Sequence, residues 1–135
     1  MQFLGFLLYY ILTRIYFGLL YLVAPLNARA KLLINGQKEI FNNLSQISDK
    51  LKTQKICWFH CASLGEFEQG KPVMLELKKL NYQILVTFFS PSGYEQKKND
   101  PTADYIFYLP FDRYNNAKKF ISLVEPKMVF WVKYD

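Results

Sequence analysis

Residues 55–69 read KICWFHCASLGEFEQ, and this stretch joins two kinds of pattern. Its first part is a short apolar run rich in aromatic residues, which is typical of a strand buried on both faces of a sheet. The run stops at Ser63, and from Glu66 to Leu80 apolar residues recur with lysines left for a solvent-facing side. The sequence therefore predicts a buried strand, a turn of small residues and a helix, which is the basic unit of an α/β fold.

The same unit repeats along the rest of the chain. Three more short apolar runs follow the first, and helix-like segments separate them. The expected strands lie in 55–63, 82–90, 104–110 and 127–135, and the expected helices lie in 66–80, directly after Ser92-Gly93, and in 112–123. Alternating strands and helices predict a parallel sheet with right-handed crossovers, so the fold class is α/β with a Rossmann-like parallel sheet.

Residues 3–26 are apolar and aromatic and contain one charge, Arg14. A helix of this length can cross a hydrocarbon core roughly 30 Å thick with Arg14 snorkelling, or it can lie in the interface. A signal peptide cleaved near Ala28-Arg29-Ala30 is disfavoured because no basic segment precedes the apolar one. A buried core helix is disfavoured by the length and hydrophobicity of the stretch. We assign residues 1–26 to a membrane anchor helix that precedes the α/β domain.

The next segment, 27–54, is an expected connector between the anchor and the domain at 55–135. Its apolar residues follow the spacing of an amphipathic or broken helix. Arg29, Lys31 and Lys38 come directly after the anchor, and by the positive-inside rule they hold the rest of the chain on the cytoplasmic side of the membrane. The same charges attract anionic lipid headgroups.

The composition excludes several classes of protein. Apolar residues make up 51% of the chain, so intrinsic disorder is excluded. The net charge of +6 favours an anionic partner, but the basic residues are scattered and no RNA-reading motif occurs, so no nucleic-acid partner is expected. Cys57 and Cys61 share one strand face at a spacing too long for an easy disulfide, and we expect reduced core residues. With His60 as the single histidine, no metal site is predicted.

In a parallel sheet, functional groups gather at the carboxyl ends of the strands. The first such end is the turn from Ser63 to Glu66, where Ser63 can start a helix and Gly65 permits close approach of a ligand. Glu66 falls in the first helical turn, and two roles are open for it. A carboxylate there stabilises the helix by about 0.3–1 kcal/mol. If it faces an open crevice instead, it can accept a proton from an attacking hydroxyl.

Further candidates stand at other strand ends. Ser92 and Gly93 belong to a small-residue elbow, which is either a plain turn or a place where free helix amides hold a phosphate or sugar hydroxyls. Asp135 ends the fourth strand and is either an electrostatic helper in the same crevice or a polar strand end. His60 alternates with Trp58 on one strand face, so we expect a hydrogen-bonded core histidine.

Four motifs together resemble the amino-terminal domain of 3-deoxy-D-manno-octulosonic acid (Kdo) transferases, enzymes of lipopolysaccharide biosynthesis. They are WFHCASLGEFEQGKPV (58–73), ILVTFFSPSGYE (84–95), YLPFD (108–112) and VEPKMVFWVKYD (124–135), and KLLINGQK (31–38) is similar too. The resemblance covers nearly the whole chain in order. It implies a GT-B glycosyltransferase, in which two Rossmann-like domains face each other across a cleft, and it makes 55–135 the acceptor-binding domain.

The resemblance also implies a reaction and a set of residues. The expected reaction is transfer of Kdo, with inversion, from CMP-Kdo to the lipid A precursor lipid IVA, without a metal or other cofactor. The expected place is the cytoplasmic side of the cell inner membrane, in contact with its lipids. The glutamate of the family's S-x-G-E motif falls on Glu66, the expected proton acceptor. Ser63, Gly65, Ser92 and Gly93 are the expected acceptor-binding residues, and Asp135 is the expected transition-state support.

The chain departs from the family pattern in three respects. Asp135 stands where glutamate is usual, and Gln37 stands where many relatives have arginine. The third is the CMP-Kdo site, which the family carries in a carboxyl-terminal domain that residues 1–135 lack. We therefore expect 55–135 to be a truncated domain and residues 1–135 to be inactive alone. The alternative function is a membrane-tethered, non-catalytic binding module or an inactive fragment without the donor-binding domain.

Overall fold

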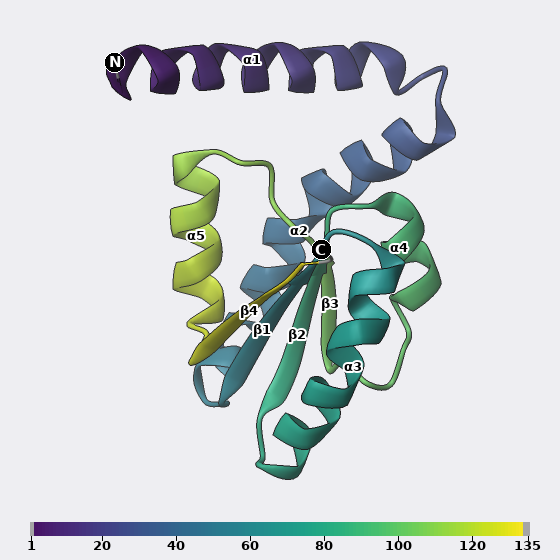
Figure 1. The fold of residues 1–135 in the computed structure, drawn as a ribbon, viewed down its shortest axis with the longest axis vertical. Coiled ribbons are helices and arrows are strands. Elements are labelled where there is room, and N and C mark those ends of the chain that lie inside the picture. Colours follow the sequence, from purple (N-terminus) through teal and green to yellow (C-terminus); the bar gives the residue numbers. More distant parts are fainter. Residues whose placement is uncertain (1, 134–135) are drawn as a thin grey trace.

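The computed structural model describes residues 2–133, which form an α/β domain with a long helix outside it (Figure 1). Its helices are α1 (Gln2–Val23), α2 (Ala28–Lys52), α3 (Leu64–Lys79), α4 (Pro91–Lys97) and α5 (Tyr114–Val124). Its strands are β1 (Ile56–Cys61), β2 (Gln83–Phe88), β3 (Tyr105–Tyr108) and β4 (Met128–Val132). Each expected strand and helix is present, and the expected amphipathic or broken helix after residue 27 is a single unbroken one.

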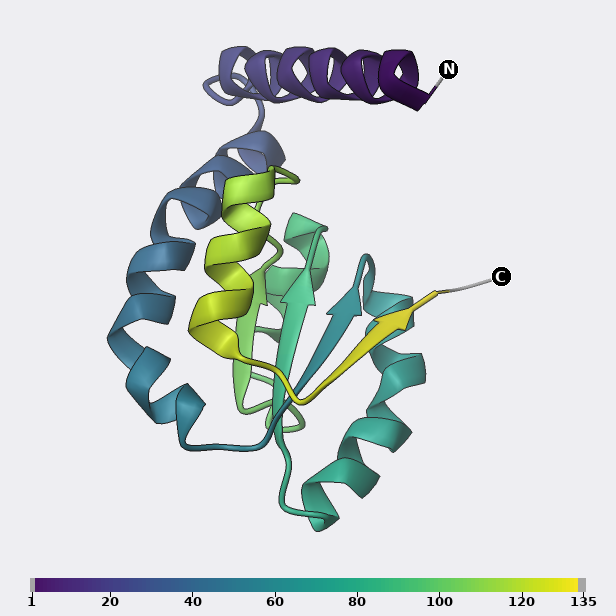
Figure 2. The same ribbon diagram turned by 90° about the vertical axis from the view of Figure 1, so that its left-hand side faces the viewer.

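The four strands form one sheet in the order β3-β2-β1-β4, and every neighbouring pair is parallel. Trp58 in β1 pairs with Leu85 of β2 on one side and with Val129 of β4 on the other. The predicted Rossmann-like parallel sheet is therefore confirmed. All four carboxyl ends lie at one edge of the sheet, and α1 lies beyond that edge (Figure 2).

Two apolar clusters lie on opposite faces of the sheet. Strands β1, β2 and β3 contribute side chains to both clusters, and β4 contributes to one. The face covered by α2 and α5 contains Trp58, Leu85 and Phe120, and the face covered by α3 contains Phe59, Phe67 and other buried residues. Both layers of helices are visible in Figure 2. Burial of this kind stabilises the fold by roughly 1.5–3 kcal/mol for each large apolar side chain.

Cys57 and Cys61 lie on the α3 face, where both are free and fully buried. Burial raises the pKa of Cys57 to about 11. Burial, together with the negative charge of Glu66, raises the pKa of Cys61 to about 12. The prediction of reduced core cysteines is confirmed, and both are neutral, unreactive thiols at physiological pH.

One strand differs from the prediction that all four are buried on both faces. β4 pairs only with β1 within the described sheet, and its residues alternate between half-buried and exposed. Met128, Phe130 and Val132 pack against the α3 layer, whereas Val129 and Trp131 are 41% and 62% exposed on the other face. In Figure 2, α5 lies to one side of β4 and does not overlie it, which leaves this face of β4 open in the described part of the chain.

Helix α1 exposes most of its large apolar side chains but contacts the domain at a few points. Phe17 stacks on Phe111 with ring centroids 4.1 Å apart, and the Tyr9 hydroxyl donates to Asp112. No single helix in residues 2–133 has the length and hydropathy needed to cross a bilayer, although the bent pair α1 and α2 passes by length and composition when taken together. The expected membrane helix therefore stays a prediction.

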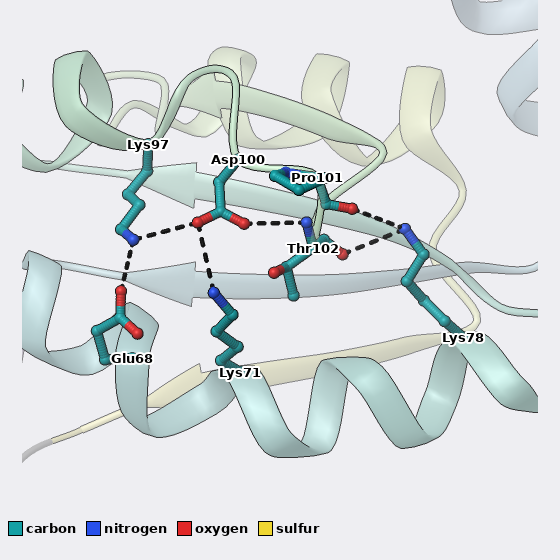
Figure 3. Close-up of polar contacts among 7 residues, drawn as sticks. All are labelled: Glu68, Lys71, Lys78, Lys97, Asp100, Pro101 and Thr102. Atoms are coloured by element: carbon teal, nitrogen blue, oxygen red, sulfur yellow. Dashed lines mark hydrogen bonds and ion pairs between the residues drawn. The ribbon is translucent and has the colours of Figure 1, made fainter.

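An ion network ties α3 to the loop after α4 (Figure 3). Lys97 pairs with Glu68 of α3 and, at 3.1 Å, with Asp100. Lys71 of α3 also approaches the carboxylate of Asp100, at 3.6 Å, while the backbone N–H of Thr102 donates to it at 3.0 Å. Glu68 is half exposed and is paired with Lys97.

Asp100 is expected to make the protein less stable in acid. Burial raises the pKa of this carboxyl, but hydrogen bonds from Thr102 and Lys97 and the charge of Lys71 outweigh that effect and lower it from 3.8 to about 2. The carboxylate therefore contributes stability above pH 3.8 that is lost as the pH falls through 2. Asp100→Asn should cost about 1–2 kcal/mol at pH 7 after allowance for solvent screening.

The measurement is urea unfolding followed by circular dichroism between pH 7 and pH 2. The variant should lose part of the acid dependence seen in the parent protein. Glu76→Gln is the matched control, because the ion pair of Glu76 with Lys79 is about two-thirds exposed on both sides and such pairs contribute little. If Glu76→Gln and Asp100→Asn behaved alike, the Asp100 network would have no special role.

Candidate functional site

The turn between β1 and α3 is a capped helix start, as the sequence predicted. Ser63 is the N-cap residue, with extended backbone (φ −138°, ψ 170°), and its hydroxyl accepts from the backbone N–H of Glu66 at 3.4 Å. The carboxylate of Glu66 reaches back and accepts from the backbone N–H of Ala62. This arrangement differs from a capping box in the partner of the glutamate, which accepts from the N–H of the residue before the N-cap serine and not from that of the serine itself.

Glu66 is half-buried, and its carboxylate is held from outside its own helix. The bond to Ala62 fixes Oε2 at the carboxyl end of β1. No hydrogen bond or ion pair to Oε1 is found in residues 2–133. One carboxylate oxygen thus orients the side chain while the other stays available. Both roles left open by the sequence are compatible with this geometry.

The elbow after β2 lies directly beside this turn. A Cβ built on Gly93 would lie 3.6 Å from the backbone N of Leu64, so the starts of α3 and α4 are neighbours. Ser92 is exposed, and its hydroxyl lies 2.7 Å from that of Ser90, which also accepts from the backbone N–H of Gly93 at 3.4 Å. The structure therefore brings together the two turns that the sequence singled out separately.

The two glycines of these turns have different surroundings. Gly93 is buried, and a Cβ there would lie 2.8 Å from the Phe88 ring, so close packing requires this glycine. Gly65 is exposed, and apart from the Ser63 hydroxyl at 3.9 Å nothing lies near its Cβ position. Space for a ligand therefore exists at Gly65 and not over Gly93. Asp135, the remaining sequence candidate, lies outside the described residues.

His60 is a hydrogen-bonded core histidine, as expected. Its Nδ1 lies 3.0 Å from the hydroxyl and 3.1 Å from the carbonyl oxygen of Thr87, and Trp58 Nε1–H donates to the same hydroxyl at 2.8 Å. Burial lowers the pKa of His60, although the hydrogen bond to Thr87 and the charge of Glu66 oppose this effect. His60 is therefore neutral at physiological pH, and Glu66 lies close enough to act on it.

The loop after β3 is held by a contact that the sequence did not reveal. Gln37 of α2 donates from Nε2 to the carbonyl oxygen of Leu109 at 2.6 Å, and its Oε1 accepts from the backbone N–H of Phe111 at 2.9 Å. The departure at Gln37 is thus explained here by a structural role. No local signal announces it, because more than seventy residues separate the partners.

One cavity of the described residues is not lined by Glu66. Its volume is about 460 Å³, and it lies between α5 and the sheet. The lining residues are mostly aromatic and apolar: Trp58, Leu109, Pro110, Phe111, Asp112, Ala117, Phe120, Ile121 and Trp131. Among the described residues predicted for the site, none of Ser63, Gly65, Glu66, Ser92 and Gly93 lines it. Residues 2–133 contain no group of three or more metal-ligating side chains either.

Comparison with known proteins agrees with this architecture. Residues 36–135 match the family model described as 3-deoxy-D-manno-octulosonic-acid transferase (kdotransferase). A 3-deoxy-D-manno-octulosonic acid transferase of Aquifex aeolicus is 38% identical over 77 residues, which cover 56% of this chain and 22% of that protein. A bifunctional glycosyltransferase/methyltransferase of Fusobacterium nucleatum is 26% identical over 98 residues, covering 70% of this chain and 15% of that protein.

The matched segments thus span about a fifth or less of these relatives, whereas the family model covers most of this chain and includes every predicted site residue. The turn that carries Glu66, the elbow at Ser92-Gly93 and the parallel sheet that brings them together all lie inside the matched region. This chain belongs to the Kdo transferase family of glycosyltransferases and carries its amino-terminal domain.

Proposed function

We propose that this chain forms the acceptor-side domain of an inverting Kdo transferase, with Glu66 as the proton acceptor. The main supporting observation is the position of the Glu66 carboxylate, which is half-buried at the carboxyl ends of the strands. The Ala62 N–H orients this carboxylate through Oε2, and Oε1 has no hydrogen bond or ion pair within residues 2–133. A general base needs a fixed position and a free lone pair toward the proton that it removes. Family membership supports a sugar donor and an acceptor, and we identify these as CMP-Kdo and lipid IVA.

In the proposed reaction, a sugar hydroxyl of the acceptor lipid attacks the anomeric carbon of Kdo. Glu66 takes the hydroxyl proton as the new carbon–oxygen bond forms. The bond from the anomeric carbon to the CMP phosphate breaks, and CMP leaves with its electron pair as an anion. Attack from the face opposite CMP inverts the anomeric carbon. No metal or redox cofactor enters this balance.

Gly65 and the exposed Ser92 hydroxyl stand where the acceptor sugar would approach Glu66, and Ser63 holds the turn that presents it. Gly93 acts through packing, because the absence of a side chain lets α4 lie against the Phe88 ring of β2. We propose that Asp135, which follows β4 in the sequence, supports the transition state. The assignments of Ser63, Gly65, Ser92 and Gly93 follow from their positions at the same edge of the sheet.

We further propose that the domain works at the cytoplasmic side of the inner membrane, attached through α1. The supporting feature is the exposed apolar surface of α1, which includes Leu8, Leu12, Ile15, Leu19 and Leu22. This helix lies beyond the edge where the strands end (Figure 2). A bilayer that held α1 would therefore bring its lipids to the edge that carries Glu66.

The test is a transfer assay on the protein expressed from its complete gene. Incubation with CMP-Kdo and lipid IVA in detergent micelles should give a lipid whose mass has increased by one or more Kdo units, measured by mass spectrometry. Transfer should persist in excess EDTA. Residues 1–135 alone should give none, because they match only 22% of the Aquifex relative. Release of CMP without a Kdo-bearing lipid would contradict the acceptor assignment.

A further inference from the structure

A basic crevice lies in the elbow between α1 and α2. Figure 1 shows this elbow on the outside of the sheet domain. The crevice has a volume of about 410 Å³. It is lined by two lysines, an amide, a phenol and three apolar side chains: Lys31, Lys38, Asn35, Tyr21, Ala24, Pro25 and Ile34. A crevice with two cations and neutral hydrogen-bonding groups suits an anion.

The elbow between α1 and α2 is held by hydrogen bonds and apolar contacts within the chain. The two helices are bent by 114° relative to each other. Asn27 forms the N-cap of α2, since its side chain accepts from the backbone N–H groups of Arg29 at 2.9 Å and Ala30 at 3.2 Å. Leu20 and Ala24 pack against the core that contains Ile34. The helices are therefore joined through a cap and apolar contacts before any ligand binds.

The charges in the crevice are uncompensated within the described chain. Lys31 and Lys38 are seven residues apart on α2, so they lie two turns apart on one side of the helix. Neither has an ion pair, hydrogen bond or aromatic contact in residues 2–133, whereas Lys71, Lys78 and Lys97 are all paired with carboxylates. Two unpaired ammonium groups beside one crevice repel each other and favour an anionic ligand between them.

Exposed apolar side chains stand next in the sequence to Tyr21 and Pro25, which line the crevice. Leu22 and Leu26, at the end of α1 and in the elbow, are 74% and 92% exposed. A free phosphate or a nucleic acid has nothing to place against them. A phospholipid has both parts, because its phosphate is bonded to a glycerol that carries acyl chains. The combination of positive charge and exposed apolar side chains therefore favours a phospholipid as the ligand.

We propose that the elbow crevice binds the phosphate of an anionic membrane phospholipid. The ammonium groups of Lys31 and Lys38 contact the phosphate oxygens, the Asn35 amide donates to them, and the acyl chains lie along Leu22 and Leu26. The proposal rests on the membrane attachment suggested under the proposed function. It adds a defined headgroup site that is separate from the acceptor sugar and Glu66.

The test is flotation of the complete protein with vesicles of phosphatidylcholine alone or with about one-third phosphatidylglycerol. For the double variant Lys31→Gln/Lys38→Gln, affinity for the anionic vesicles should fall about twentyfold, from about fivefold per lysine. The matched control is Lys118→Gln/Lys127→Gln, which removes the same charge from two exposed lysines on α5 and before β4. It should lose no more than about threefold, and Lys31→Arg/Lys38→Arg should bind like the parent.

Equal losses in both glutamine variants would overturn the proposal, because net charge alone would then explain binding. No loss in either would overturn it as well. Binding of millimolar glycerol phosphate that depends on Lys31 and Lys38, without binding to anionic vesicles, would show a site for soluble phosphate instead. Failure of the parent protein to bind any vesicle would refute the membrane attachment itself. The transfer assay in micelles tests Glu66 chemistry separately, so the two proposals can fail independently.

Discussion

Glu66→Gln is expected to lower the kcat for Kdo transfer by about 10²–10⁴-fold in the complete protein. Glutamine has the same size, and its carbonyl oxygen can still accept from the Ala62 N–H that holds the glutamate. It cannot take a proton from the attacking hydroxyl. The helix start and acceptor binding should therefore survive while the chemical step slows. Initial rates with CMP-Kdo and lipid IVA, beside a lipid-binding titration and a melting curve, separate these effects.

Glu68→Gln is the matched control for this experiment. Glu68 lies two residues further along α3, and its carboxylate pairs with Lys97 on the surface (Figure 3). Its replacement removes the same charge from the same helix but leaves the sheet edge unchanged, so kcat should stay within about twofold and stability should fall by less than about 1 kcal/mol. Unchanged turnover in Glu66→Gln would show that Glu66 stabilises the helix start and is not the proton acceptor.

Gly36→Ala is expected to destabilise the fold by about 2–3 kcal/mol, near the upper end for overpacked cores. A Cβ built on Gly36 would lie 2.2 Å from two ring carbons of Tyr108, far inside van der Waals contact. The ring cannot swing aside easily, because Tyr108 is 4% exposed and stacks on Tyr94 with centroids 4.1 Å apart. Helix α2 must then move away from β3. We expect a melting temperature lower by roughly 10 °C.

Gly18→Ala gives the opposite expectation and serves as the control. Gly18 is also in the interior of a helix, but nothing lies within 4 Å of a Cβ built there. Alanine favours a helix over glycine by up to about 1 kcal/mol, so this variant should be as stable as the parent or more stable. Thermal unfolding by circular dichroism compares the two. If Gly36→Ala also raised the melting temperature, the close approach of α2 to Tyr108 would be wrong.

The strands of the sheet could be predicted because the apolar composition that marks each strand is a local feature of the sequence. The run from Ile56 to Cys61 is apolar except for His60, most of Gln83–Phe88 is apolar too, and both are central strands. The N-cap role of Ser63 and the first-turn position of Glu66 likewise depend on residues 63–66 alone. The alternating exposure of β4 was missed, because the composition of a strand does not tell which helix covers it.

The remaining site features depend on residues far apart in the chain. The bond from Tyr9 to Asp112 and the stacking of Phe17 on Phe111 join segments separated by about ninety to one hundred residues. The neighbouring positions of Gly93 and Leu64 depend on how α3 and α4 lie across one sheet face. Such contacts follow from the packed fold, and no local pattern encodes them. The sequence singled out both turns at the site, and the fold showed that they are adjacent.

Gln37 and the loop that it holds are expected to change together during evolution. Its carboxamide donates to Leu109 and accepts from Phe111 at the same time. Arginine and lysine carry donors only, and an ionised glutamate carries acceptors only, so each would leave one backbone group of the loop unsatisfied. Substitution at this position is therefore epistatic. A different side chain can become fixed only after the Leu109 carbonyl or the Phe111 N–H has gained another hydrogen-bond partner.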